Sequence, residues 1–250
     1  MQWFLSALLL VLFSAAPSTQ LYADDSANTS SNTGGTAFGN AYTLDGAQLL
    51  YTETHHWQGP THTVEYFRPN GDLIAVNRLD SSLSFVSPTY TQLYPSANFS
   101  EGARWHNADL VLFFAAKEQV VSFQKPLVLS SGFYHFVLEH WRDLHAGQAQ
   151  LFDFAVPSRW MTVRLRMHAL DSNAGTTVIR GGDPSWFYVR VEAANPLLRW
   201  LVHPLTVALD DRQRLMVYRG VSSVRDERGE TPQVLIHYRY PDPVVSSVAP

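Results

Sequence analysis

The sequence predicts a mainly β fold of the α+β class: a curved antiparallel sheet or incomplete barrel, covered by one long and one short helix. Three observations predict it. Aromatic residues are abundant, with 14 Phe, 11 Tyr and 7 Trp, and they favour pleated, half-buried surfaces. Several segments alternate apolar with polar residues, and short polar turns recur between them. With 250 residues, 46% of them hydrophobic and 16% charged, the chain can bury a sizeable core.

The N-terminal segment is expected to be an export signal. Residues 3–16 form an apolar run that is too short to span a bilayer comfortably and that fits the apolar region of a secretory signal peptide. Cleavage after Ala16 is hindered by Pro17, so we expect a signal peptide at 1–23, cleaved after Ala23. The mature protein is then periplasmic and has no transmembrane segment. Because no Lys or Arg precedes the apolar run, an uncleaved anchor is the alternative.

Composition divides the rest of the chain. Residues 24–40 are rich in Ser, Thr, Asn and Gly, which predicts a flexible leader. Residues 41–240 are expected to form a single β-rich domain, and 241–250 an irregular tail. The absence of cysteine excludes disulfides, thiolate metal sites, a cysteine nucleophile and a lipobox anchor. The formal net charge of -4 points to no nucleic-acid partner.

Turn chemistry and alternation locate the strands. Pro-Asn-Gly at 69–71 separates 63–67 from 73–79 and predicts a hairpin, because Gly supplies the positive φ of a tight reversal. The apolar run 110–114 is expected to pair with 119–123. The clearest alternation predicts a strand over 161–168, in which odd-numbered residues share the apolar face. Further strands are expected at 49–57, 152–156, 186–192, 205–209, 214–219 and 234–240.

Two helices are expected to interrupt the sheet. The long one carries an apolar stripe that should pack on the sheet: Phe133, Phe136, Val137, His140, Trp141 and Leu144. Ser130 or Ser131 is expected to cap its start, and Gly147 to end it. The short helix is capped by Asn195, starts at Pro196 and continues to Val202.

The ten histidines are not expected to bind a metal. Three of them recur every five residues and so cannot converge on one ion: His135, His140 and His145. His55 and His56 point to opposite faces of a strand, whereas His62 lies across a short turn and can join one of them in a two-histidine surface site. Solvated or hydrogen-bonded strand histidines are the main interpretation. We therefore expect no metal and no cofactor.

No recognised catalytic motif is present, so we expect a protein that is not an enzyme. The Gly-x-Ser-x-Gly elbow is absent, and the glycine-rich residues 181–184 match no phosphate-binding fingerprint. Asp210 and Asp211 lie in an expected turn. A dispersed Ser-His-Asp set is the alternative, because triads are defined by geometry rather than by sequence order.

Two groups of side chains are candidates for binding. Four tryptophans either belong to the core or line a cavity for an apolar ligand: Trp141, Trp160, Trp186 and Trp200. Arg164 and Arg166 share the polar face of one strand, and Arg159 lies just before it. These arginines either form cross-strand ion pairs or make an anion patch that meets lipid headgroups or a partner.

Several segments together resemble an uncharacterised family of exported bacterial proteins: 64–75, 132–141, 154–159, 197–204 and 218–223. The resemblance covers residues 42–240, with Ser223 standing where the family pattern has Asn. It implies no established activity. The layout also looks like the incomplete β-barrels of periplasmic lipoprotein carriers, in which a curved sheet wraps helices around an apolar cavity.

These expectations combine into one leading hypothesis: an exported envelope protein that binds an apolar ligand such as a lipid or acyl chain. Export, the abundant aromatics and the apolar strand faces motivate it. The alternative is an envelope assembly or interaction module that binds a protein partner and no small ligand. An enzyme is the third possibility.

Overall fold

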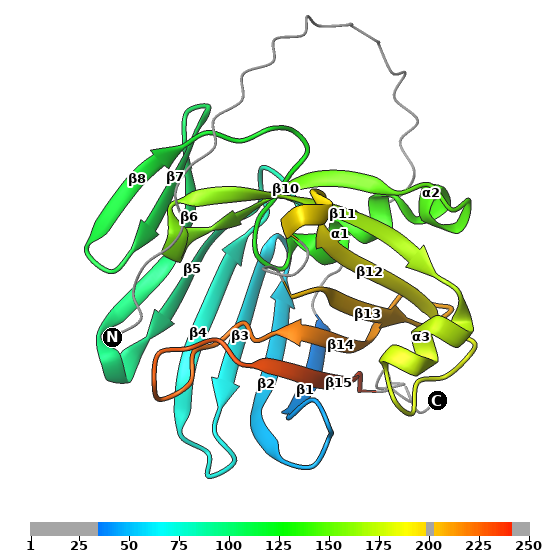
Figure 1. Ribbon diagram of the computed structural model, residues 1–250. Coiled ribbons are helices and arrows are strands. Elements are labelled where there is room, and N and C mark those ends of the chain that lie inside the picture. The colour runs from blue at the N-terminus through cyan, green and yellow to red at the C-terminus, as the bar shows by residue number, and fades with distance from the viewer. Residues whose placement is uncertain (1–34, 199–202, 242–250) are drawn as a thin grey trace, which may run out of the picture. The chain divides into compact units, whose positions relative to one another are not determined.

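The computed structural model describes residues 35–198 and 203–241, which form a fifteen-stranded sheet (Figure 1). Its first eight strands are β1 (Gly35–Tyr42), β2 (Leu49–Gln58), β3 (Thr61–Phe67), β4 (Leu73–Asp80), β5 (Thr89–Tyr94), β6 (Phe99–His106), β7 (Asp109–Phe114) and β8 (Lys117–Val121). The other seven are β9 (Leu127–Val128), β10 (Gln150–Val156), β11 (Met161–Leu170), β12 (Phe187–Ala193), β13 (Leu205–Leu209), β14 (Leu215–Val221) and β15 (Gln233–Arg239).

Helices are few in the described residues. They are α1 (Gly132–Glu139), α2 (Trp141–His145), α3 (Ser172–Val178) and three short 3₁₀ helices at Pro95–Ala97, Pro157–Arg159 and Pro196–Leu198. Within the described residues, no helix combines the length and apolar character that crossing a membrane requires.

The strand order shows two meanders joined at one place. The order runs from β8 down to β1, then from β15 down to β9, and neighbours are antiparallel except for the β9–β10 pair. The join is the β1–β15 pair, in which Phe38 lies opposite Arg239. The predicted mainly β class, with a large unclosed antiparallel sheet, is therefore confirmed.

The sheet begins earlier than the sequence predicts. Residues 35–40, expected to belong to a flexible leader at 24–40, are part of β1, because their backbone pairs with β2 on one side and β15 on the other. The composition of this segment is poor in apolar residues, but the two neighbouring strands supply its hydrogen bonds. The expected signal peptide at 1–23 and leader residues 24–34 lie outside the described residues, as do 242–250 of the tail.

The predicted hairpins are confirmed. Gly71 has a φ of 91° in the turn between β3 and β4, and β7 pairs with β8 as expected. In β11, Leu165 and Met167 are buried in the core, in line with the predicted alternation, whereas Met161 is 48% exposed at the strand's start.

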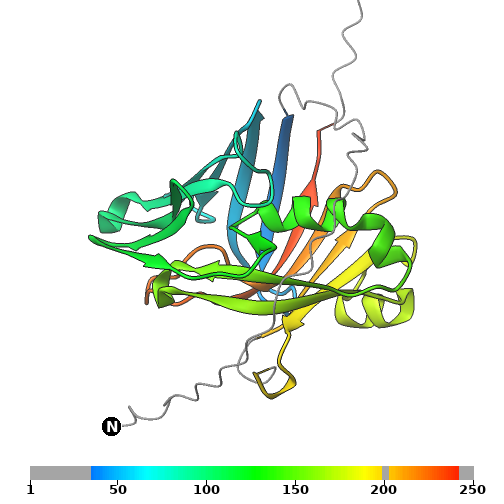
Figure 2. The ribbon, with the colours of Figure 1, turned by 90° about the horizontal axis from the view of Figure 1, so that it is seen from above.

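The predicted apolar helix stripe packs on the sheet, but the helix is broken. Figure 2 shows α1 on the inner side of the curved sheet, and Phe136, Val137 and Leu144 are buried against β10 to β13. The single helix expected over 133–144 is divided at His140, whose φ of -100° and ψ of 19° are not helical. The His140 ring packs on Phe136 and hydrogen-bonds to the Asp143 carboxylate. The spacing of apolar residues in the sequence does not predict these contacts.

The helix ends are only partly as predicted. Ser131 occupies the N-cap position of α1, but its side chain makes no capping hydrogen bond. Gly147, with a φ of 78°, ends the segment as expected. The carboxamide of Asn195 accepts from the N–H of Leu197, so the predicted cap of the short helix is present. The residues that would complete this helix, 199–202, lie outside the described residues.

Helix α3 was not predicted and lies against the other face of the sheet. Asp171 caps it by accepting from the Ala174 N–H at 2.9 Å. A Cβ on Gly175 would lie 2.2 Å from the Tyr188 ring, so glycine is required for this contact. Tyr188 belongs to a separate buried cluster with Ile179 and Val217.

The two ends of the sheet meet without strand pairing. Apolar residues of β7 and β8, such as Leu112 and Val121, are buried in one cluster with Leu127 of β9 and Ala155 of β10. A polar contact reinforces this seam at Asp153, which is 5% exposed. Its carboxylate accepts from the Gln124 N–H at 2.6 Å, from the Thr162 hydroxyl at 3.3 Å and from Arg164 at 3.1 Å. Asp153 therefore ties the 122–126 connection to β10 and β11.

We expect Asp153→Ala to lower the free energy of unfolding by about 2–3 kcal/mol, because it leaves a buried N–H and a guanidinium without their acceptor. Urea unfolding followed by circular dichroism measures the change. Leu151→Ala, on the same strand at a site 47% exposed, is the matched control and should change stability by less than about 0.5 kcal/mol. A loss below about 1 kcal/mol for Asp153→Ala would show that the apolar cluster alone holds the seam.

Candidate functional site

The inner side of β1 to β5 carries a buried carboxylate, Glu53, which is 2% exposed. Space for it comes from Gly39 on the paired strand β1, because a Cβ there would lie 2.6 Å from the Glu53 Cγ. The Tyr238 hydroxyl hydrogen-bonds to this carboxylate, and Tyr51 and Tyr66 lie close by. Burial, and then the nearby Glu53 charge, raises the pKa of all three tyrosines, which therefore remain neutral donors at physiological pH.

Two histidines extend this carboxylate into a hydrogen-bonded chain. The Glu53 Oε1 lies 3.1 Å from Nε2 of His55, and Nδ1 of His55 lies 3.0 Å from Nε2 of His62. Trp57 stacks on His62 with ring centroids 4.4 Å apart and fixes its plane. Because a carboxylate only accepts, the network assigns the proton to Nε2 of His55 and then to Nε2 of His62.

The sequence predicted part of this hydrogen-bonded network. His62 joins His55 across the β2–β3 turn, as the expected two-histidine pairing allows, while His56 lies on the exposed face. Burial, and then the proximity of His55, lowers the pKa of His62 from 6.5 to about 3, and burial also lowers that of His135. His62 is therefore neutral at physiological pH and takes part in the network by hydrogen bonding rather than by charge.

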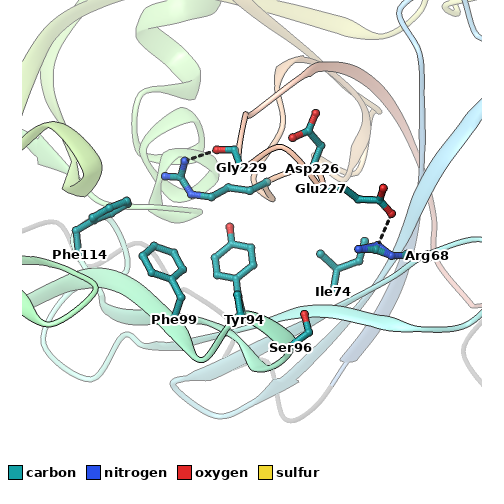
Figure 3. A pocket seen from close by; sticks show the side chains of 11 residues that line it. Arg68, Ile74, Tyr94, Ser96, Phe99, Phe114, Asp226, Glu227 and Gly229 are labelled. Atoms are coloured by element: carbon teal, nitrogen blue, oxygen red, sulfur yellow. Dashed lines mark hydrogen bonds and ion pairs between the residues drawn. The ribbon is translucent and has the colours of Figure 1, made fainter.

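A second feature is an open cavity of about 500 Å³, which Glu53, His55 and His62 do not line. Figure 3 shows Tyr94, Phe99 and Phe114 rising from the sheet side, and Asp226, Glu227 and Gly229 facing them from the β14–β15 loop. Its lining is completed by Arg68, Ile74, Ser96, Ala97 and Arg225. One wall is thus aromatic and the opposite wall is charged.

Arg225 holds the charged wall in place. Its Nε and Nη2 donate to the two carboxylate oxygens of Glu101 at 3.2 and 2.9 Å, and its Nη1 donates to the Gly229 carbonyl at 3.0 Å. The guanidinium also lies 5.2 Å from the centroid of the Phe114 ring and 5.9 Å from that of Phe99. This bidentate pair, with cation–π contacts, fixes the loop against β6 and β7.

Polar contacts connect the cavity to the interior. The Gln92 amide donates to the Tyr94 hydroxyl at 2.6 Å, and that hydroxyl lies 3.4 Å from Glu101. Tyr94 is therefore shared between the aromatic wall and the buried polar residues, and burial raises its pKa to about 12. It is neutral at physiological pH, and its hydroxyl is engaged by Gln92 and Glu101 while its ring contributes to the cavity lining.

The structure places the candidate tryptophans in separate clusters. Trp141 packs on the core under α1, Trp160 packs against the seam, and Trp186 packs against the cluster beside α3. Trp200 lies outside the described residues. None of the three described tryptophans lines the 500 Å³ cavity. The three described tryptophans therefore do not form one shared site. Their role in ligand binding stays a prediction.

The candidate arginines lie beside carboxylates. Arg164 pairs with Asp153 at 3.1 Å, and Arg166 pairs with Glu192 at 3.4 Å. These are the cross-strand ion pairs that the sequence offered as the alternative to an anion patch. Arg159 is exposed in the short helix before β11. The carboxylates offset much of the positive charge on this face, and the headgroup patch stays a prediction.

In the described part of the chain, no three or more metal-binding side chains gather in one place. His135, His140 and His145 make separate contacts, with Phe85, Asp143 and the Trp141 carbonyl respectively.

Comparison with known proteins adds a structural likeness. The chain matches no protein-family model and no curated protein sequence. It is similar to the crystal structure of a β-barrel-like protein, a domain of unknown function (DUF1849) from Brucella abortus, over 84% of this chain and 96% of that one. The identity is 8% and the TM-score is 0.40, so the likeness is distant. The expected resemblances to an exported family and to lipoprotein carriers stay predictions.

Acidification is expected to weaken the fold through His62. Its pKa is lower in the folded chain, about 3 against 6.5, so the unfolded state binds more protons as the pH falls below 6.5. The stabilisation is present above pH 6.5 and is lost progressively toward pH 3. For this one group, the free energy of unfolding should fall by about 2 kcal/mol between pH 7.5 and pH 5.

Urea unfolding of the wild type and of His62→Gln at both pH values measures this effect. The variant should lose most of that pH dependence, whatever its stability at pH 7.5. His106→Gln, at an exposed site on β6, is the control and should keep the wild-type dependence. Equal dependence in His62→Gln and the wild type would contradict the assignment.

Proposed function

We propose that this protein is an exported binding protein of the cell envelope that holds the apolar part of an amphipathic ligand, such as a lipid or acyl chain, in the 500 Å³ cavity. The observation that carries the proposal is the aromatic wall formed by Tyr94, Phe99 and Phe114. Binding sites for small ligands are concave, lined largely by apolar and aromatic side chains, and have volumes of about 300–1,000 Å³.

The pre-formed shape of the cavity supports the proposal. Arg225 is bonded on three sides and pairs with a Glu101 side chain that is 13% exposed, so the loop wall is held without a ligand. A second ion pair between the loop and the sheet joins Glu227 to Arg68 at 3.6 Å. A cavity that is already ordered avoids the entropy cost of ordering on binding.

Export to the periplasm and the absence of catalysis are parts of this proposal that rest on the sequence. The apolar N-terminal run and the small residues before Asp24 support export. No recognised catalytic motif is present in the sequence.

Binding is tested with an uncharged fluorescent amphiphile, a pyrenyl dodecanol, titrated into the purified protein. We expect saturable binding that Phe114→Ala weakens about tenfold, since truncating a ring that contacts the ligand removes about 1.5 kcal/mol of apolar contact. Phe85→Ala, 49% exposed and outside the cavity, is the control and should bind as the wild type does.

Ala97→Trp tests the same site without removing any contact. Ala97 is exposed on the cavity lining, so an indole there should occupy the space and weaken binding at least tenfold. Ala97→Ser is the matched control and should bind within about twofold of the wild type. Unaltered binding in Ala97→Trp, or no saturable binding by the wild type, would overturn the proposed function.

An envelope interaction module is the second candidate, favoured by the edge strand β8. In the described sheet β8 pairs with β7 alone, and Val120 on it is 58% exposed. A free strand edge is a template for an added strand. A photocrosslinker at position 120 in cells should then capture a discrete partner, while one at exposed Leu83 should not. Identical adduct patterns at both positions would rule out this candidate.

A further inference from the structure

We propose that the ligand of the 500 Å³ cavity carries a cationic rather than an anionic polar end, and is therefore an ammonium-bearing amphiphile. This inference rests on the proposed function and adds the charge class of the ligand. It follows from which charges around the cavity are already engaged and which are left over.

The guanidinium groups are engaged. Nε and Nη2 of Arg225 donate to the Glu101 carboxylate, and Nη1 donates to the Gly229 carbonyl. Arg68 pairs with Glu227 at 3.6 Å. An anionic headgroup at Arg225 would have to displace Glu101, and this pair is largely buried, so the exchange leaves a carboxylate without its partner. At Arg68 it would compete with the Glu227 carboxylate, which is 82% exposed.

The carboxylates are in excess. Glu101, Asp226 and Glu227 surround the cavity or touch its lining, against the two guanidinium groups of Arg68 and Arg225. In the described residues no ion pair involves Asp226, whose Oδ1 accepts the Arg228 and Glu230 N–H groups at 2.9 Å each. Arg228 and Glu230 lie on the same loop but do not line the cavity, and their charges offset each other. The remaining charge at the cavity is therefore negative.

The aromatic wall is suited to a cation. Arg225 already lies over the Phe99 and Phe114 rings, which shows that their faces accept positive charge. Tyr94 contributes a further ring beside them, with its hydroxyl near Glu101. An ammonium group in the cavity gains the attraction of the excess carboxylate charge and, at ring faces that Arg225 does not cover, the ring electrostatics.

A headgroup series at constant chain length tests the inference. Dodecylamine, dodecanol and dodecanoate, each below its micelle concentration, compete with the pyrenyl dodecanol probe at pH 7.5 and low salt. We expect the amine to bind about fivefold more tightly than the carboxylate. This is the ratio expected when one net negative charge lies roughly 8 Å from the ligand headgroup in a water-like dielectric, since it attracts the ammonium and repels the carboxylate equally. The difference should shrink in about 0.5 M salt.

The variant Asp226→Asn removes the one net negative charge while keeping the side-chain shape. Asn at 226 retains the oxygen that accepts the loop N–H groups. The variant should still bind dodecanol measurably and should lose its preference for the amine over the carboxylate. Dodecanoate binding as tightly as the amine, with dodecanol still bound, would overturn the charge assignment alone. Failure of all three ligands to bind would instead overturn the proposed function.

Discussion

The sheet is unclosed, and the structure depends on how its two ends are held together. No backbone ladder joins β8 to β9, so the contact between the ends relies on side chains: an apolar cluster and the buried carboxylate of Asp153. The curved sheet also brings residues of β4 to β7 opposite the β14–β15 loop. The cavity exists because strands far apart in the sheet order are brought to face each other.

The interior shows how polar groups are accommodated on a concave face. Glu53 is buried where Gly39 leaves room, and it bonds to Tyr238 and His55 rather than to an Arg or Lys. A buried carboxylate is tolerated only when its lone pairs are occupied. Tyrosine and histidine donors satisfy it in a region that also holds the apolar cluster of Tyr51 and Tyr66.

Local patterns predicted the class of fold and many strands, but not the site. Alternation located β11, and Pro-Asn-Gly located the β3–β4 turn, because both signals lie within a few residues. β1 was missed because its hydrogen bonds come from β2 and from β15, strands that composition cannot reveal. The Glu53–His55–His62 chain was half visible, since two histidines flank a tight turn, but a fully buried glutamate is rare enough to go unpredicted.

The cavity had no sequence signal at all. Its aromatic wall takes single residues from β5, β6 and β7, and its charged wall comes from a loop more than a hundred residues later. The tryptophans were candidates because they are large aromatic residues. Hydrophobicity does not predict which cluster a ring packs against. Each described tryptophan packs against a different cluster: Trp141, Trp160 and Trp186.

The β1–β15 pair gives the chain an unusual connectivity. Every other ladder joins strands adjacent in sequence, whereas this one spans Phe38 to Arg239. It is the ladder with the largest sequence separation, and the two meanders must meet before it forms. Connecting the end of β15 to the start of β1, and opening the chain between β8 and β9, would make every ladder local. That circular permutant would have only local ladders, which favours faster folding. It would also cut the 122–126 connection that Asp153 holds to β10. The same chain break would therefore speed folding and weaken the contact between the two ends of the sheet.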